Sequence, residues 1–244
     1  MKRKKRTISF LITIMVMLSV ALCSIDGVAA VKQEKLDPKK PMIALTFDDG
    51  PGNRTGELLD VLEKYNARAT FFVLGSRLNT TKARKNLKKM EAIGCEIGNH
   101  TASHKSLSSL SAKKIKKEIL SVDKKVKKYT GHKPKVLRPP YGAGTKNATV
   151  RKHVGKPMIY WSIDTLDWKT KSKKKTVKTV MKNVKDGDII LMHDIHSTSV
   201  DAAIELIPKL IKKGYQLVTV SELANARGVK LKNGKTYYSF RPSK

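Results

Sequence analysis

The chain of 244 residues has little cysteine, and this shortage excludes one class of protein. Only Cys23 and Cys95 occur, and Cys23 lies within an N-terminal apolar run. A disulfide framework of the kind that holds small secreted domains together is therefore excluded for the rest of the chain. Cys95, in "GCEIGNH", is interpreted as a small buried apolar residue. Stability must come from the packing of an apolar core, which a chain of this length can supply.

Long apolar runs are also lacking, except at the N-terminus. There a basic stretch, "MKRKKR", precedes the apolar stretch "ISFLITIMVMLSVALC", and the small residues "VAA" end at Ala30. This pattern predicts a signal peptide over residues 1–30, followed by a polar linker over residues 31–40. The apolar stretch is also close to the roughly 18 residues that a membrane span needs, so an uncleaved anchor is the alternative. We expect the protein at the cell wall or outside the cell, or else anchored in the membrane and facing outward.

Acidic residues are scarce, with 20 Asp and Glu against 51 Lys and Arg, and the formal net charge is +31. Such an excess favours anionic partners. Nucleic acid is a poor candidate, because aromatic residues make up only 6% and no basic region alternates with stacking residues. An exported basic protein would first meet anionic wall polymers or lipid head groups. The alternative is a lysine-rich surface that binds nothing specific.

Between residues 41 and 228, short apolar runs alternate with helical periodicity, which favours a single α/β domain with parallel strands. Strands are expected at 42–47, 70–74, 95–98, 136–137, 158–163, 188–192 and 216–220. Helical apolar faces are expected at 58–65, 115–129, 177–184 and 200–211. Asn233 and Gly234 predict a hairpin in the tail, residues 229–244. Periodicity alone does not separate an open doubly wound sheet from a closed barrel, but in both, ligands bind at the carboxyl ends of the strands.

Unusual polar clusters follow five of the expected strands. They are "TFDDGP", "NHTASH", "RPPYG", "DTLDW" and "HDIH", in chain order. Gly, Pro and Asp are common in ordinary turns, so a single such cluster would mean little. Five clusters at five strand ends are expected to meet at one mouth, which predicts a functional site there.

Two histidines and a pair of aspartates have the composition of a metal site. His100 and His104 are four residues apart, a spacing that puts both imidazoles on one face of a helical turn. Two His and one carboxylate form a ligand set that leaves positions open for water and substrate. One of Asp48 and Asp49 would complete the set, and the other would be free to act as a base, because successive side chains at a strand end point in different directions.

Hydrolysis of an amide or ester also needs an acid for the leaving group. His193 suits this role, since its unperturbed pKa is about 6.5. A nearby carboxylate would keep it protonated, and Asp167 is a candidate. Arg138 is expected to fix the base by a bidentate contact. Trp168 and Leu191 are candidates for lining a small pocket.

These five motifs, over residues 41–223, resemble those of the polysaccharide deacetylases of carbohydrate esterase family 4, the NodB-homology domain. The resemblance implies a distorted (β/α) barrel of seven or eight strands. It implies metal-dependent removal of N- or O-acetyl groups from polysaccharides. It also implies that Asp48 is the catalytic base and that the metal ligands are Asp49, His100 and His104. The metal expected for such a set is Zn²⁺, with Co²⁺ as an alternative.

The resemblance implies further roles. Arg138 would orient the base, the backbone N–H of Tyr141 would help to hold the oxyanion, and Asp167 would tune the acid His193. No role is assigned to three other histidines, His132, His153 and His196.

The stretch "GDIILMHDIHSTSVDA" resembles in particular the peptidoglycan N-acetylglucosamine deacetylases of Gram-positive bacteria. Relatives that act on N-acetylmuramic acid in spore-cortex formation typically have Asn in place of Asp49, which favours N-acetylglucosamine here. Chitin oligomers, poly-N-acetylglucosamine and acetylxylan stay open as other substrates of the same chemistry. An inactive basic wall-binding module is the alternative from a different functional class.

Overall fold

The structure is a computed structural model that describes residues 36–242. The predicted signal or anchor, residues 1–30, lies outside the described residues. The strands are β1 (Met42–Asp48), β2 (Thr70–Val73), β3 (Glu96–Asn99), β4 (Met158–Ile159), β5 (Ile163–Asp164), β6 (Ile189–His193), β7 (Gln216–Leu217) and β8 (Thr236–Tyr237). The helices are α1 (Thr55–Lys64), α2 (Thr81–Ala92), α3 (Ala112–Thr130), α4 (Ala148–His153), α5 (Asp167–Thr170), α6 (Lys173–Asn183), α7 (Ser197–Lys212) and α8 (Val220–Ala226). Within residues 36–242, no helix is both long enough and apolar enough to cross a membrane.

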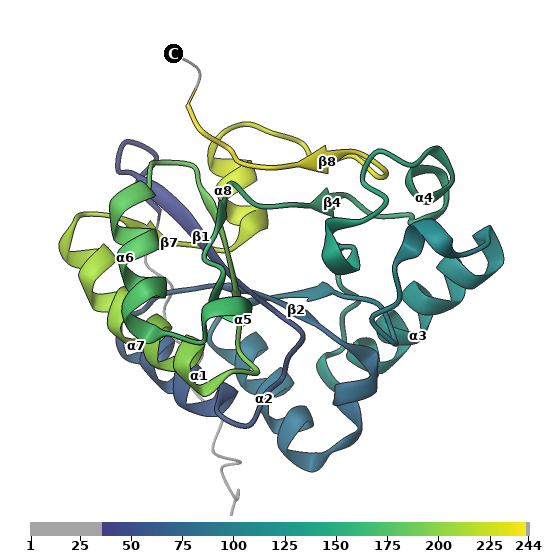
Figure 1. Cartoon of the computed structure of the whole chain (residues 1–244), viewed down its shortest axis with the longest axis horizontal. Coiled ribbons are helices and arrows are strands. Elements are labelled where there is room, and N and C mark those ends of the chain that lie inside the picture. Colours follow the sequence, from purple (N-terminus) through teal and green to yellow (C-terminus); the bar gives the residue numbers. More distant parts are fainter. Residues whose placement is uncertain (1–35, 243–244) are drawn as a thin grey trace, which may run out of the picture.

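Every pairing between these named strands is parallel. The larger sheet has the order β3-β2-β1-β6-β5, with β7 beside the first residues of β1, and β4 pairs with β8. Leu137 bridges to both Asn99 and Met158, so it links the end of β3 to β4 and joins the two sheets. The helices lie around the outside of this curved set of strands (Figure 1). The arrangement confirms the predicted parallel α/β fold and agrees with a distorted barrel.

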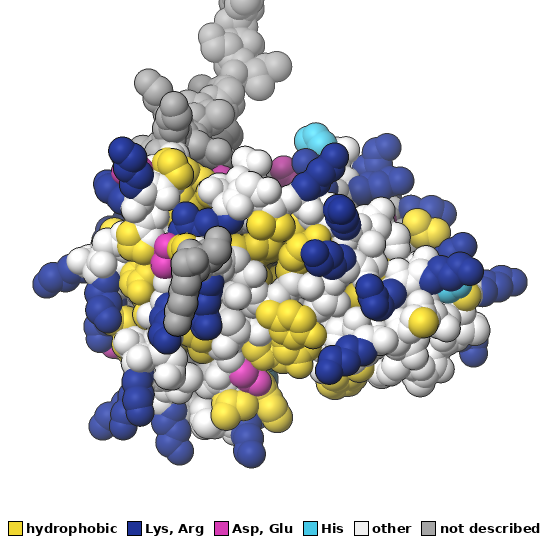
Figure 2. All heavy atoms as spheres, turned by 90° about the horizontal axis from the view of Figure 1, so that it is seen from above, with side chains coloured by type: hydrophobic (Ala, Val, Ile, Leu, Met, Phe, Trp, Pro, Cys, Tyr) yellow, Lys and Arg dark blue, Asp and Glu magenta, His cyan; other side chains and the backbone are white. Residues whose placement is uncertain are grey.

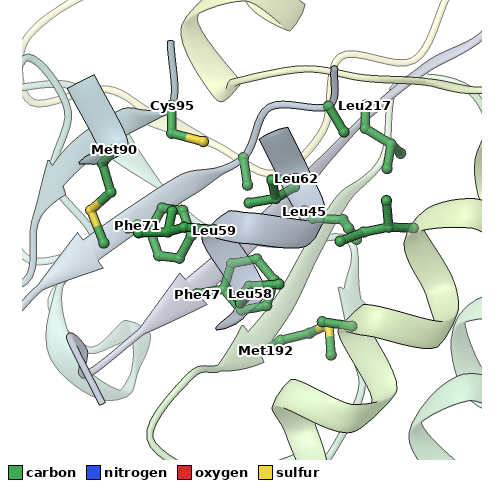
Figure 3. Packing of buried hydrophobic residues seen from close by; sticks show 14 of the residues in the cluster. Leu45, Phe47, Leu58, Leu59, Leu62, Phe71, Met90, Cys95, Met192 and Leu217 are labelled. Atoms are coloured by element: carbon green, nitrogen blue, oxygen red, sulfur yellow. The ribbon is translucent and has the colours of Figure 1, made fainter. Parts of the chain in front are cut away.

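Apolar side chains of the central strands pack against the surrounding helices (Figure 3). Phe47 of β1 and Phe71 of β2 stack with their ring centroids 5.1 Å apart. Leu58 and Leu62 of α1 belong to the same cluster and have no exposed surface. Burying one such side chain contributes roughly 1.5–3 kcal/mol. The cluster fixes β1 and β2 in the middle of the fold, and with them the chain that leaves their carboxyl ends.

The four predicted helical faces all form, but the sequence did not point to α2. The faces of α1, α3, α6 and α7 carry regularly spaced apolar residues, and most of these are buried. In α2 the buried positions are Ala83, Leu87 and Met90, together with the polar Asn86, and lysines fill half of the rest. So sparse a stripe resembles a solvated loop. The Thr80 hydroxyl starts this helix by accepting a hydrogen bond from the Ala83 N–H (3.1 Å).

Three strand predictions were too long. The segment expected at 136–137 makes only the single-residue bridges of Leu137, and the segment 158–163 divides into β4 and β5 with Tyr160 and Trp161 between them. The strand expected at 216–220 ends at Leu217, because Thr219 caps α8 in a capping box with Glu222. Aromatic residues are common in strands, so the composition of this pair predicted a continuous strand. The two rings instead stack on each other with their centroids 3.9 Å apart.

The predicted C-terminal hairpin is wrong. A turn does form at Asn233 and Gly234, but the strand that follows it, β8, pairs in parallel with β4 and not with the residues before the turn. Those residues are held by side chains, since the Lys232 N–H donates to the Tyr237 hydroxyl (2.9 Å). The Gly234 N–H donates to the Lys156 carbonyl (2.9 Å), which ties the turn to the body of the protein. The tail is therefore an integral part of the fold.

Candidate active site

The two neighbouring aspartates leave β1 in different backbone conformations. Asp48 is the last residue of the strand and is 4% exposed, whereas Asp49 has φ at 70°, in the left-handed region. In the register of β1 and β6, Asp48 lies opposite His193. Strand pairing thus brings the first and the last of the five motifs side by side.

Asp49, His100 and His104 form a group that fits a divalent metal ion. One ligand atom of each lies within 4.8 Å of the others. Asp49 Oδ1 is 3.1 Å from His104 Nε2 and 3.4 Å from His100 Nε2. The same oxygen is buried and has no hydrogen-bond partner among the described residues. A buried carboxylate oxygen left without a donor and faced by two imidazole nitrogens is the environment that a cation completes.

Both imidazoles are oriented by a partner on the ring nitrogen that faces away from Asp49. His100 Nδ1 lies 2.7 Å from the Arg138 carbonyl oxygen. Because a carbonyl only accepts, Nδ1 carries the proton, and the lone pair of Nε2 points toward Asp49. His104 Nδ1 lies 3.1 Å from the Tyr141 hydroxyl. This contact ties the third motif to the second, and nothing in the sequence indicated it.

The electrostatics of this group favour an ionised carboxylate at Asp49 and a neutral imidazole at His104. Burial alone would raise the pKa of Asp49, but the nearby side chains of His100, His104 and His193 outweigh it and lower this pKa to about 2. For His104 the order is reversed: burial lowers its pKa, and the charge of Asp49 opposes this only in part. A carboxylate with neutral imidazoles is the protonation state that binds a metal.

The two histidines do not lie on a helical turn, as their spacing suggested. They belong to the loop after β3, in which Thr101 (φ 72°) and His104 (φ 60°) are both left-handed. Side chains hold this strained loop: the Thr101 N–H donates to Asn99 Oδ1 (2.8 Å), and the N–H of Ala102 donates to Glu118 Oε2 on α3 (2.9 Å). The imidazoles converge because of this loop, and the four-residue spacing does not itself produce the geometry.

Arg138 contacts Asp48, but through one nitrogen and not by the expected bidentate pair. Its Nη1 donates to Asp48 Oδ1 (2.7 Å) and to the Thr46 hydroxyl (2.7 Å). Its Nε and Nη2 donate to the carbonyl oxygens of Ile159 (3.1 Å) and Tyr160 (2.8 Å). The side chain has no exposed surface, and burial lowers the pKa of the guanidinium although the charge of Asp48 opposes this. With its donors shared in this way, Arg138 fixes Asp48 relative to the backbone at the end of β4.

Asp167 holds His193 with both carboxylate oxygens. His193 Nδ1–H donates to Oδ1 (2.8 Å), and the His193 backbone N–H donates to Oδ2 (2.7 Å). Burial works against a charged imidazole, but the hydrogen bond and charge of Asp167, with the charges of Asp48 and Asp49, raise the pKa of His193 to about 9. The pair therefore keeps His193 protonated at neutral pH, with Nε2 as its remaining donor.

A cavity of about 380 Å³ brings these groups to a common space. Its lining residues are Asp48, Asp49, His100, His104, Tyr141, Trp161, Asp164, Trp168, Leu191 and His193. Arg138 and Asp167 lie behind the lining and contact Asp48 and His193. Trp161 and Asp164 were not predicted to belong to the site. Trp161 lies three residues before the fourth motif and Asp164 is its first residue, and their place beside a strand end was the signal available.

The histidines without a predicted role do not line the cavity. His132 and His153 lie at the ends of α3 and α4, and His196 begins α7 with its ring centroid 6.3 Å from that of His193. Cys95 is buried, and burial raises the pKa of its thiol to about 12, which agrees with an inert core residue.

Comparison with known proteins gives two related groups of relatives. The chain is 45% identical over 197 residues to peptidoglycan-N-acetylmuramic acid deacetylase PdaC of Bacillus subtilis, a match that covers 80% of this chain and 41% of PdaC. It is 41% identical over 199 residues to peptidoglycan-N-acetylglucosamine deacetylase PgdA of Listeria monocytogenes, again covering 80% of this chain and 41% of the relative. The chain thus spans about two fifths of the length of these curated relatives.

Solved structures agree with the fold. The structure of PdaC covers 79% of this chain and 94% of that chain, at 44% identity and a TM-score of 0.75. A family 4 acetyl xylan esterase of Clostridium thermocellum, solved in complex with a cobalt ion, covers 81% of this chain and 98% of that chain, at 33% identity and a TM-score of 0.74.

The family model named polysaccharide deacetylase matches residues 35–159. This range holds both aspartates of the first motif, the two histidines of the metal group and Arg138. His193 and Asp167 lie beyond it, and β1–β6 pairing brings His193 to Asp48. Because the family model matches just over half of the chain and the fold is like that of the solved structures, the chain belongs to the polysaccharide deacetylase family.

Proposed function

We propose that this protein hydrolyses the N-acetyl groups of N-acetylglucosamine residues in cell-wall peptidoglycan. The observation that carries the proposal is one cavity lined by a base, a metal-binding group and an acid: Asp48, the group around Asp49, and His193. The names of the relatives support peptidoglycan as the polymer.

Asp49, His100 and His104 would hold the divalent metal. Zn²⁺ is our first choice for such a set and Co²⁺ the second. When bound, such an ion polarises the acetyl carbonyl and makes water a stronger nucleophile at neutral pH.

The remaining steps fall to side chains of the cavity. Asp48, held by Arg138, takes a proton from the attacking water as oxygen bonds to the carbonyl carbon. The backbone N–H of Tyr141 is proposed to donate a hydrogen bond to the carbonyl oxygen as negative charge develops on it. His193, kept protonated by Asp167, gives its Nε2 proton to the amide nitrogen as the C–N bond breaks. The products are acetate and a free amine on the sugar.

N-acetylmuramic acid is a second candidate sugar, because the relative that is 45% identical is named for it. Asp49 favours N-acetylglucosamine, as the sequence analysis argued. Muropeptides from purified walls, analysed by mass spectrometry before and after incubation with the protein, test both at once. We expect loss of about 42 Da, the mass that an acetyl group adds, from the glucosamine residue, and a rate of loss roughly 10²–10⁴-fold lower with Asp48→Asn. Loss from the muramic acid residue alone would favour the second candidate, and loss from neither would contradict the proposal.

We further propose that the protein acts outside the cell at the wall, either released or anchored through its N-terminal segment and facing outward. The basic stretch followed by an apolar stretch supports export. Fractionation of cells into cytoplasm, membrane and wall, followed by N-terminal sequencing, distinguishes the two cases. Recovery in the cytoplasm would contradict both.

A further inference from the structure

Three exposed aromatic side chains lie at or near the cavity. Tyr141 is 69% exposed and Trp168 is 48% exposed, and both line the cavity. Tyr238 is 44% exposed but belongs to the C-terminal segment, which none of the five motifs includes. Large apolar side chains are seldom left so accessible in a group unless they meet a ligand.

Tyr238 continues an aromatic strip that begins inside the cavity. Trp161 lines the cavity, and Tyr160 stacks on it with the ring centroids 3.9 Å apart and the planes 8° from parallel. Tyr238 contacts Tyr160 in turn, with the ring centroids 4.8 Å apart and the planes tilted by 53°. The parallel pairing of β4 and β8 brings these residues together, since the Tyr160 N–H donates to the Tyr237 carbonyl (2.8 Å).

The strip is held rigidly to the reacting groups. Arg138 donates to the Tyr160 carbonyl and to Asp48 through the same guanidinium. Gly142, next to Tyr141, packs so closely on Tyr160 that a Cβ at Gly142 would lie 2.2 Å from the Tyr160 ring. The aromatic strip and the catalytic groups are therefore parts of one fixed surface.

On the face that carries β8, apolar side chains lie near the centre with lysine and arginine side chains around them (Figure 2). The flat faces of Tyr and Trp rings offer apolar area with a negative π-surface. The C–H groups on the face of a pyranose ring are weakly polarised donors that suit such a surface.

We infer that Tyr160, Trp161 and Tyr238 form a binding platform for a sugar residue that lies beyond the one being deacetylated. The inference rests on the proposed function, because it assumes that the ligand in the cavity is part of a glycan strand. Continuity with the cavity through Trp161 identifies the occupant as the next part of that strand. The platform lets the protein prefer long strands, since only a strand that reaches past the cavity touches Tyr238.

The test compares the N-acetylglucosamine dimer with the hexamer. Binding is measured by calorimetry in an Asp48→Asn background, where turnover does not interfere, and kcat/KM is measured in the native background. Tyr238→Ala should weaken hexamer binding and lower kcat/KM for the hexamer about tenfold, the factor that corresponds to about 1.4 kcal/mol. Binding and kcat/KM for the dimer should change less than twofold.

Two matched variants separate stacking from other effects. Tyr238→Phe keeps the ring and should behave like the parent within twofold. Tyr65→Ala removes another exposed tyrosine, 38% exposed at the end of α1 and outside the cavity lining, and should leave both oligomers unaffected. Thermal unfolding of each variant checks that the fold is intact.

The platform is overturned if Tyr238→Ala affects dimer and hexamer equally, if it leaves the hexamer unchanged, or if the parent binds the hexamer no more tightly than the dimer. These outcomes are separate from the proposed function. Acetate release from peptidoglycan decides the function, whereas hexamer binding with and without the Tyr238 ring decides the platform even in a protein that releases no acetate.

Discussion

Replacing Asp167 by Asn should move the high-pH limb of the pH–rate profile, where the general acid His193 loses its proton, to lower pH. The acid itself remains in place. Asp167 accepts two hydrogen bonds from His193, one from the ring and one from the backbone, and is 1% exposed. Asn can keep the size and one acceptor but carries no charge. The variant therefore removes the main interaction that raises the pKa of His193.

The size of the effect follows from the two pKa values. With the pKa of His193 at about 9, about 90% of the imidazole is protonated at pH 8. At the unperturbed value of about 6.5, only about 3% is protonated at that pH. On these two values the protonated fraction falls about 30-fold at pH 8 but less than about twofold at pH 6, so the limb of the variant should lie about 2.5 pH units below that of the parent. Burial, which opposes the charged imidazole, increases the loss further.

Acetate release from the N-acetylglucosamine hexamer at pH 5.5–9.5, with saturating metal, measures both limbs. A cation near Asp49 lowers the pKa of His193 in parent and variant alike. The prediction is therefore tested by the difference in pH between the high-pH limbs of the two proteins. Asp164→Asn is the matched control, because Asp164 also lines the cavity but forms no hydrogen bond or ion pair with His193 within residues 36–242. A loss of equal size at every pH would refute the reasoning and assign Asp167 a purely structural role.

Four further outcomes are expected. Asp48→Asn should keep its metal and lose roughly 10²–10⁴-fold in rate, as is typical for loss of a general base. Asp49→Asn should lose metal first, and added metal should partly restore its rate. Metal content and acetate release are measured on both variants, and the opposite pattern would reverse the two roles. Chelation should abolish acetate release and Zn²⁺ or Co²⁺ restore it, and His100→Ala should not be restored; full activity in protein shown to be metal-free would contradict the ligand assignment. The pKa of His193 is raised on folding, so its pairing stabilises the protein fully below about pH 6.5 and is lost as the pH rises through about 9, by up to about 3 kcal/mol in the free energy of unfolding; denaturant titrations should show this loss in the parent and not in His193→Gln. Binding to isolated walls should weaken as salt screens the basic surface over about 8–10 Å, while turnover of a neutral dimer should depend on salt much less; wall binding that ignores salt would argue against charge as the cause.

The residues of the candidate site could be predicted from the sequence because several of them end a strand or directly follow one. Asp48 ends β1, His100 follows β3 and His193 ends β6, and parallel strands deliver their carboxyl ends to one edge. Apolar runs in the sequence predict where these strands lie along the chain, even without a structure. The position of these residues therefore depended on little beyond strand order, and the structure brings all of them to one cavity.

The interactions around the reacting groups could not be predicted, because they depend on backbone geometry. The left-handed loop at Thr101 and His104 turns the two imidazoles toward Asp49. The four-residue spacing suggested a helix instead. Tyr238 reaches the cavity side only because β8 pairs in parallel with β4, and the Asn-Gly turn suggested a hairpin. Local patterns do not say which distant strand a short segment will pair with.

The burial of Arg138 has a consequence for how activity could be lost in descendants of this chain. Its guanidinium has no exposed surface, and Asp48 is the carboxylate that balances its charge. Removing one member of such a buried pair typically costs about 3–5 kcal/mol, whereas replacing both by apolar residues can be nearly neutral. A lineage that abandons catalysis should therefore not drift at position 48 alone. We expect inactive descendants to change positions 48 and 138 together, so that the two positions covary even where selection for the reaction has ceased.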